Sequence, residues 1–121
     1  MPQRQILVVE DEEIARDVLI QALETLGFGA IGAANGRHAL EILALQPVDM
    51  ILTDIYMPEM NGLELLKQLR DQGSTLPVVL ITGYDADDAR QAAETYRASA
   101  LLLKPFRLVQ LKQILDKILA G

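Results

Sequence analysis

Short apolar segments alternate with longer amphipathic segments along the chain. The apolar segments are QILVV at 5–9, FGAIG at 28–32, DMILT at 49–53, PVVLI at 77–81 and ALLL at 100–103. The first, third and fourth are almost continuously apolar, which is typical of parallel strands covered by helices on both faces, whereas half-exposed strands alternate. The pattern therefore predicts a parallel β-sheet with a buried centre.

The segments between these strands carry apolar residues at helical spacing. In residues 12–26, Ala15, Leu19, Ala22 and Leu26 share one helical face, and Gly27 is placed to end the helix. The other helices are expected at 37–45, 61–71, 85–97 and 107–119, the last with a core stripe at Leu108, Leu111, Ile114, Leu115 and Ile118. Strands and helices in strict alternation predict an α/β fold, with right-handed crossovers placing the helices on both sides of the sheet.

Length and composition limit the classes of function. The 121 residues fit a single domain spanning 1–121. Seventeen acidic and eleven basic residues give a net charge of −6, the wrong sign for a nucleic-acid surface, so we expect no direct nucleic-acid binding. The chain has no cysteine, which excludes thiolate chemistry and suits a cytoplasmic protein. The N-terminal residues form neither a signal peptide nor a membrane span, so no membrane insertion is expected.

Charged and hydroxyl residues stand at the ends of four predicted strands. Glu10 and Asp11 follow the first strand, Asp54 the third, Thr82 the fourth and Lys104 the fifth. In an open parallel sheet the carboxyl ends of the strands form the ligand-binding edge. We therefore expect these side chains to converge at one site.

Three carboxylates at one edge would repel each other unless a cation lay between them. Mg²⁺ prefers oxygen ligands and leaves positions open for a phosphoryl oxygen. Asp54 could then act as a carboxylate nucleophile that forms an aspartyl phosphate, with Lys104 neutralising the phosphoryl oxygens and the Thr82 hydroxyl donating a hydrogen bond. The residues alone thus predict Mg²⁺-dependent phosphoryl transfer onto Asp54.

The whole chain resembles the receiver domains of bacterial two-component response regulators. The motifs that carry the resemblance are VVEDEE at 8–13, LTDIYMPEMNG at 52–62, VVLITG at 78–83 and LLLKPF at 101–106. The resemblance implies a flavodoxin-like, doubly wound five-stranded parallel sheet in the order 2-1-3-4-5, with five helices on both faces. It also implies a regulatory switch in place of a conventional enzyme, one that assists its own phosphorylation and dephosphorylation.

The resemblance assigns roles and partners. Glu10, Asp11 and Asp54 would bind Mg²⁺, or Mn²⁺ in its place, together with the backbone carbonyl of Tyr56. Asp54 would be the phosphoacceptor, Thr82 the switch hydroxyl and Lys104 the phosphate partner. The phosphoryl donor would be a histidine kinase or histidine phosphotransfer protein, and the output would be an effector, either covalently linked or separate.

Three alternative functions share part of this pattern. A haloacid-dehalogenase-like phosphohydrolase needs a second Asp two residues after the nucleophile, where this chain has Tyr56. A flavodoxin-like cofactor binder needs a phosphate-cradling loop without carboxylates after the first strand, which here reads Glu10-Asp11. A receiver-like module that no longer accepts phosphate is supported by Leu101 alone, which stands where the family usually has an aromatic residue.

The resemblance also yields finer expectations. The Lys104-Pro105 bond should be cis, although only about 5 to 6% of X-Pro bonds in folded proteins are. A flank of the first helix, made by Ile14, Val18 and Gln21, should receive the phosphoryl donor. From their residue types alone, Pro58 and Gly62 are expected only to shape the turn after Asp54.

Two tyrosines bear on how long a phosphoryl group would stay. Tyr56 and Tyr84, each two residues beyond a predicted site residue, are placed to hinder water attack on the phosphoryl group. The same rings could equally lie on the surface, without any effect on hydrolysis. His38, the only histidine, is expected to be exposed without a role in chemistry.

Overall fold

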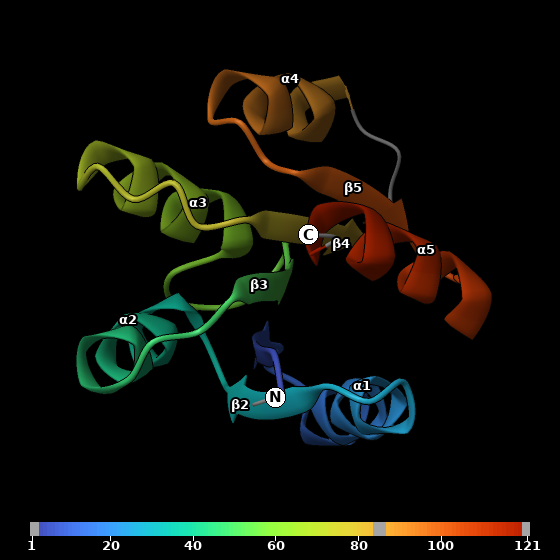
Figure 1. Ribbon diagram of the computed structural model, residues 1–121. Coiled ribbons are helices and arrows are strands. Elements are labelled where there is room, and N and C mark those ends of the chain that lie inside the picture. The colour runs from blue at the N-terminus through green and yellow to red at the C-terminus, as the bar shows by residue number, and fades with distance from the viewer. Residues whose placement is uncertain (1–2, 84–86, 120–121) are drawn as a thin grey trace.

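The computed structural model describes residues 3–83 and 87–119 as five strands that alternate with five helices (Figure 1). The strands are β1 (Gln5–Val9), β2 (Gly29–Ala33), β3 (Met50–Asp54), β4 (Val78–Thr82) and β5 (Ala100–Leu103). The helices are α1 (Glu13–Thr25), α2 (Gly36–Leu45), α3 (Gly62–Asp71), α4 (Asp87–Thr95) and α5 (Leu108–Leu119). None of these helices combines the length and hydropathy that a transmembrane span requires.

All five strands form one parallel sheet in the order β2-β1-β3-β4-β5. Helices α1 and α5 cover one face, and α2, α3 and α4 cover the other (Figure 1). The sheet order and the placement of the helices confirm the predicted doubly wound architecture. Because the strands are parallel, all of their carboxyl ends lie along one edge.

Alternate residues of each strand point into two separate apolar cores. The core under α1 and α5 contains Ile6 and Val8 of β1, and the core under α2, α3 and α4 contains Leu7 and Val9. Leu101, at the position where an aromatic residue was expected from the resemblance, is half-buried against the second of these cores. Both faces of the central strands are therefore covered, which explains their uninterrupted apolar sequences.

Several predicted boundaries and core positions differ from the structure by small amounts. Asp54 and Thr82 are the last residues of β3 and β4, whereas the sequence pattern had placed them just beyond those strands. On α1 the fully buried position is Leu23, which lay outside the predicted stripe. Leu108, assigned to the core stripe of α5, is the first residue of that helix and is exposed, whereas Leu111 and Leu115 of the same stripe are buried.

Local signals at helix ends agree with the structure. Gly27 follows α1 with φ of 94°, a left-handed conformation that favours glycine. Asn61 caps α3 by accepting a hydrogen bond from the Glu64 N–H, and the Glu64 side chain accepts one from the Asn61 N–H. This capping box starts α3 directly after the loop that follows Asp54.

Candidate functional site

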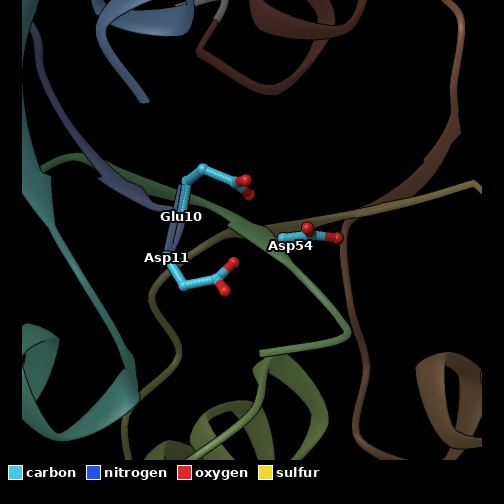
Figure 2. Close-up of side chains that lie close together, drawn as sticks. All are labelled: Glu10, Asp11 and Asp54. Atoms are coloured by element: carbon cyan, nitrogen blue, oxygen red, sulfur yellow. The ribbon is translucent and has the colours of Figure 1, made fainter. Parts of the chain in front are cut away.

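Three carboxylates meet at the carboxyl edge of the sheet. Glu10 and Asp11 directly follow β1, and Asp54 ends the adjacent strand β3. One oxygen from each side chain lies within 4.8 Å of the others, and Figure 2 shows the side chains gathered around a common space. The structure thus brings together the three acids that the sequence singled out.

Burial makes this cluster electrostatically costly when it holds no cation. Glu10 is only 3% exposed, and its Oε2 atom has no hydrogen-bond partner among the described residues. Burial, a hydrogen bond with Asp54 and the charge of Asp54 raise the pKa of Glu10 from 4.5 to about 7, with Lys104 acting in the opposite direction. A buried, unpartnered carboxylate oxygen beside two further acids fits a hard divalent cation such as Mg²⁺, which prefers oxygen ligands.

Lys104 follows the edge strand β5, on the opposite side of β3 from β1, which carries Glu10 and Asp11 at its end. Its Nζ atom is 3.5 Å from Asp54 Oδ2, and the lysine side chain is 39% exposed. Its backbone N–H donates a 2.8 Å hydrogen bond to the Thr82 carbonyl, which ties the end of β5 to the end of β4. The Lys104-Pro105 bond is cis, as predicted. Thr82 itself is completely buried at the end of β4.

The loop after Asp54 is held at both ends by backbone hydrogen bonds. The Ile55 N–H donates to the Ile81 carbonyl at 2.9 Å, and the Gly62 N–H donates to the Ile55 carbonyl at 3.0 Å. Tyr56 lies in this loop and is 52% exposed as a residue. Tyr84, the second tyrosine of interest, lies outside the described residues.

Gly62 does more than shape the turn after Asp54, the only role that its residue type predicts. A Cβ atom at this position would overlap the backbone carbonyl oxygen of Asp54 and would lie 3.1 Å from the Ile55 Cα. Gly62 therefore allows the first turn of α3 to approach the main chain of Asp54. No spacing rule in the sequence reveals this approach, because it depends on how α3 packs against the end of β3.

A second contributor, Arg16, was not recognised from the sequence at all. Its Nη1 atom donates a 2.9 Å hydrogen bond to the Glu10 carbonyl oxygen. The one available signal was Gly32, a glycine inside a strand, which often marks a close approach of another group. His38, by contrast, is exposed as expected, and its Nδ1 atom accepts a hydrogen bond from the Ala34 N–H.

Taken together, these groups can bind a divalent cation and neutralise an anion beside one carboxylate. Glu10 and Asp11 supply negative charge on one side of Asp54, and Lys104 supplies positive charge on the other. A group with three negative oxygens, such as a phosphoryl group, needs cations on several sides when it is transferred. The geometry therefore suits phosphoryl chemistry at Asp54.

Comparisons with known proteins point the same way. The family model described as the response regulator receiver domain matches residues 6–116. The response regulator receiver protein CpdR of Brucella abortus is 35% identical over 116 residues, covering 96% of this chain and 97% of that protein. A probable transcriptional regulatory protein of Picosynechococcus is 37% identical, and the match covers 88% of this chain but only 45% of that longer protein.

Solved structures show the same similarity to response regulators at the level of the fold. The chemotaxis protein CheY4 of Vibrio cholerae superposes with a TM-score of 0.90 at 28% identity, covering 97% of this chain and 99% of that one. The agreement thus extends to the whole sheet and its helices as well as to the motifs. The chain belongs to the response regulator receiver domain family, whose members are regulatory phosphoacceptor domains.

Proposed function

We propose that Asp54 is the phosphoacceptor of this receiver domain and that residues 1–121 act as one switching unit. The main support is that one carboxylate oxygen each of Glu10, Asp11 and Asp54 lies within 4.8 Å of the others. In addition, Lys104 Nζ is 3.5 Å from Asp54 Oδ2. Asp54 is the member of the cluster that also faces a lysine. The Asp54 side chain is partly buried, with 13% of its surface exposed.

In the proposed reaction, a carboxylate oxygen of Asp54 attacks the phosphorus of a phosphohistidine. The new P–O bond forms as the P–N bond breaks, and the donor leaves as an imidazole that takes up a proton. The Lys104 ammonium neutralises charge on the phosphoryl oxygens, and the Thr82 hydroxyl donates a hydrogen bond to one of them. The product is an aspartyl phosphate whose added charge changes partner binding.

A cation site is part of the same proposal. Glu10, Asp11, Asp54 and the backbone carbonyl of Tyr56 would hold Mg²⁺, or Mn²⁺ in its place. The bound ion would supply positive charge that offsets the carboxylates and the incoming phosphoryl group. The buried Glu10 Oε2 atom, which lacks a hydrogen-bond partner among the described residues, supports this assignment.

The proposed donor is a histidine kinase or histidine phosphotransfer protein that docks on α1. Ile14 and Val18 are 74% and 59% exposed and line a groove of about 640 Å³ that extends to Lys104 and Phe106. Exposed apolar residues next to a reactive site are typical of a protein-binding surface. Gln21, the third predicted contact, is exposed but does not line this groove.

We also propose how the signal leaves the domain and in which compartment it acts. The phosphorylated domain would act on an effector, linked to it or separate, in the cytoplasm. It would also assist the hydrolysis of its own phosphoryl group, which is a regulatory activity and not turnover of an external substrate.

The central test is phosphorylation by a small donor. Incubation with acetyl phosphate and Mg²⁺ should add one phosphoryl group that hydroxylamine removes, as measured by intact mass. Asp54→Asn should accept none, and chelation of the metal should abolish the reaction in the wild type. Equal phosphorylation of Asp54→Asn and wild type would show that another residue is the acceptor.

A further inference from the structure

We propose that Arg16 is a positioning residue that orients the Glu10-Asp11 pair for cation binding, with Gly32 providing the space in which it lies. The inference deepens the proposed function and rests on the cation site described there. Arg16 Nη1 donates a 2.9 Å hydrogen bond to the Glu10 carbonyl oxygen. That carbonyl belongs to the peptide that joins the two acids.

The Glu10 carbonyl needs a donor from outside the sheet. The Glu10 N–H still donates to the Ala33 carbonyl at 3.0 Å, which continues the pairing of β1 with β2 by one residue. Beyond that bond the strands separate, because β2 ends at Ala33 and α2 begins at Gly36. The Arg16 guanidinium takes the place of the next strand donor and fixes the peptide where regular pairing ends.

Arg16 holds the chain on both sides of Asp11. Its side chain bonds the Glu10 carbonyl, and its backbone N–H donates a 2.9 Å hydrogen bond to the Glu12 carbonyl. The turn from β1 into α1 is therefore closed around Asp11 by one residue. These two bonds restrain the backbone from which the Glu10 and Asp11 side chains project.

Gly32 explains why the arginine can reach this position. A Cβ atom on Gly32 would lie 3.0 Å from Arg16 Cδ and 3.3 Å from Arg16 Cγ, closer than side chains normally pack. The absence of a side chain lets the stem of Arg16 cross β2. Glycine weakens a strand interior, and this contact gives a reason for its presence there.

The sign of the change in Mg²⁺ affinity when Arg16 is replaced distinguishes a positioning role from a simple effect of its charge. Removing a positive charge near a cation site should by itself strengthen Mg²⁺ binding, because repulsion is relieved. Loss of orientation should weaken binding instead. Partners that orient metal ligands commonly contribute about 10- to 100-fold to metal affinity.

The test is calorimetric titration of the metal-free protein with Mg²⁺, together with urea unfolding in EDTA. We expect Arg16→Met, which keeps the stem and loses the donors, to weaken Mg²⁺ binding roughly tenfold. Arg16→Lys should recover part of that loss, and Gly32→Ala should weaken binding by displacing the arginine. Arg97→Met, which removes an arginine in the turn before β5, is the matched control and should leave the Kd unchanged.

The outcomes distinguish this inference from the function on which it rests. Arg16→Met and Gly32→Ala proteins that bind Mg²⁺ as tightly as wild type, or more tightly, would overturn the positioning role even if they were less stable in urea. If Arg16→Met did not fold, Arg16→Lys and Gly32→Ala would decide by the same Kd comparison. A wild-type protein that bound no Mg²⁺ would overturn the proposed cation site and this inference with it.

Discussion

Gly62 brings the first turn of α3 against the main chain of Asp54, where a side chain would overlap the Asp54 carbonyl oxygen. The main chain of a central strand cannot move aside as a flexible side chain can. We therefore expect Gly62→Ala to lower the free energy of unfolding by roughly 1 to 3 kcal/mol, the usual range for overpacking. It should also slow acetyl phosphate labelling.

Gly83 offers a matched control for this change. A Cβ atom on Gly83 meets nothing within 4 Å, so Gly83→Ala should leave the urea unfolding curve close to that of wild type. A Gly62→Ala protein as stable as Gly83→Ala would show that α3 adjusts without cost.

Tyr56 is the second residue with a testable role, since it follows Asp54 by two positions and is 52% exposed. If the ring hinders water approaching the phosphoryl group, Tyr56→Asn should shorten the lifetime of the phosphoprotein. A barrier change of about 1.4 kcal/mol corresponds to a tenfold change in rate, so even partial shielding should be measurable by decay of the intact-mass signal. Tyr56→Phe keeps the ring and should retain the wild-type lifetime; equal decay of all three proteins would place the ring on the surface without a role.

At the scale of elements, α1 carries apolar residues on two flanks. Leu23 is fully buried in the core, whereas Ile14 and Val18 are exposed and line the groove beside Lys104, which Leu19 also borders. Ile14→Asp should slow transfer from a phosphohistidine donor, because it places a charge in the apolar contact, while acetyl phosphate labelling stays at the wild-type rate. Leu45→Asp, at an 86% exposed position on α2, should affect neither reaction. Equal loss with both donors would instead point to damage of the site.

Helix α3 is joined to the turn before β5 by one side chain, Arg70. Its guanidinium donates to the carbonyl oxygens of Tyr96, Leu76 and Arg97 at 2.9 Å each and of Ser74 at 3.1 Å. Burial, followed by the charge of Arg97, lowers the pKa of Arg70. These contacts lie at the amino ends of β4 and β5, across the sheet from the acidic cluster.

Loss of this guanidinium would leave several carbonyl oxygens without their donor. We expect Arg70→Met to lower the free energy of unfolding by about 2 kcal/mol, because hydrogen bonds to charged groups contribute more than neutral ones. The rate of acetyl phosphate labelling should not change, given the distance from Asp54. Urea unfolding of Arg70→Met beside Arg97→Met is the measurement, and equal curves would contradict a structural role.

At the scale of the whole molecule, the buried acid links folding to pH. In the metal-free protein the pKa of Glu10 is raised from 4.5 to about 7, so between these values the folded state holds a proton that the unfolded state releases. The contribution of Glu10 to the free energy of unfolding should therefore fall as pH rises through this window. At higher pH the folded protein carries the full cost of a buried carboxylate.

Thermal unfolding in EDTA at pH 5 and pH 8 checks this linkage. We expect Glu10→Gln to be more stable than wild type at pH 8, and the difference to shrink at pH 5. Saturating Mg²⁺ at pH 8 should stabilise wild type more than Glu10→Gln, because a ligand that binds only the folded state raises stability. Parallel pH profiles for the two proteins would show that Glu10 does not titrate as the structure indicates.

The sequence by itself determined the order of the elements, the parallel sheet and the residues of the acidic site. Short, uninterrupted apolar segments that alternate with amphipathic helices are typical of strands with both faces covered, and parallel strands bring their carboxyl ends to one edge. The strand-end residues Glu10, Asp11, Asp54 and Lys104 were therefore enough to locate the acidic cluster and the lysine beside it. These features are readable because they depend on neighbouring positions and on a general rule of sheet geometry.

Only the tertiary structure decided which groups support that site and which apolar residues are exposed. Arg16 reaches the Glu10 carbonyl across Gly32, and α3 approaches the main chain of Asp54 at Gly62. Arg70 donates hydrogen bonds to carbonyl oxygens in two turns that are far apart in the sequence. The exposure of Leu108 likewise depends on where α5 starts relative to the sheet. Each of these contacts joins segments far apart in the chain, at distances set by how helices pack on the sheet, and no periodicity along the sequence encodes such a distance.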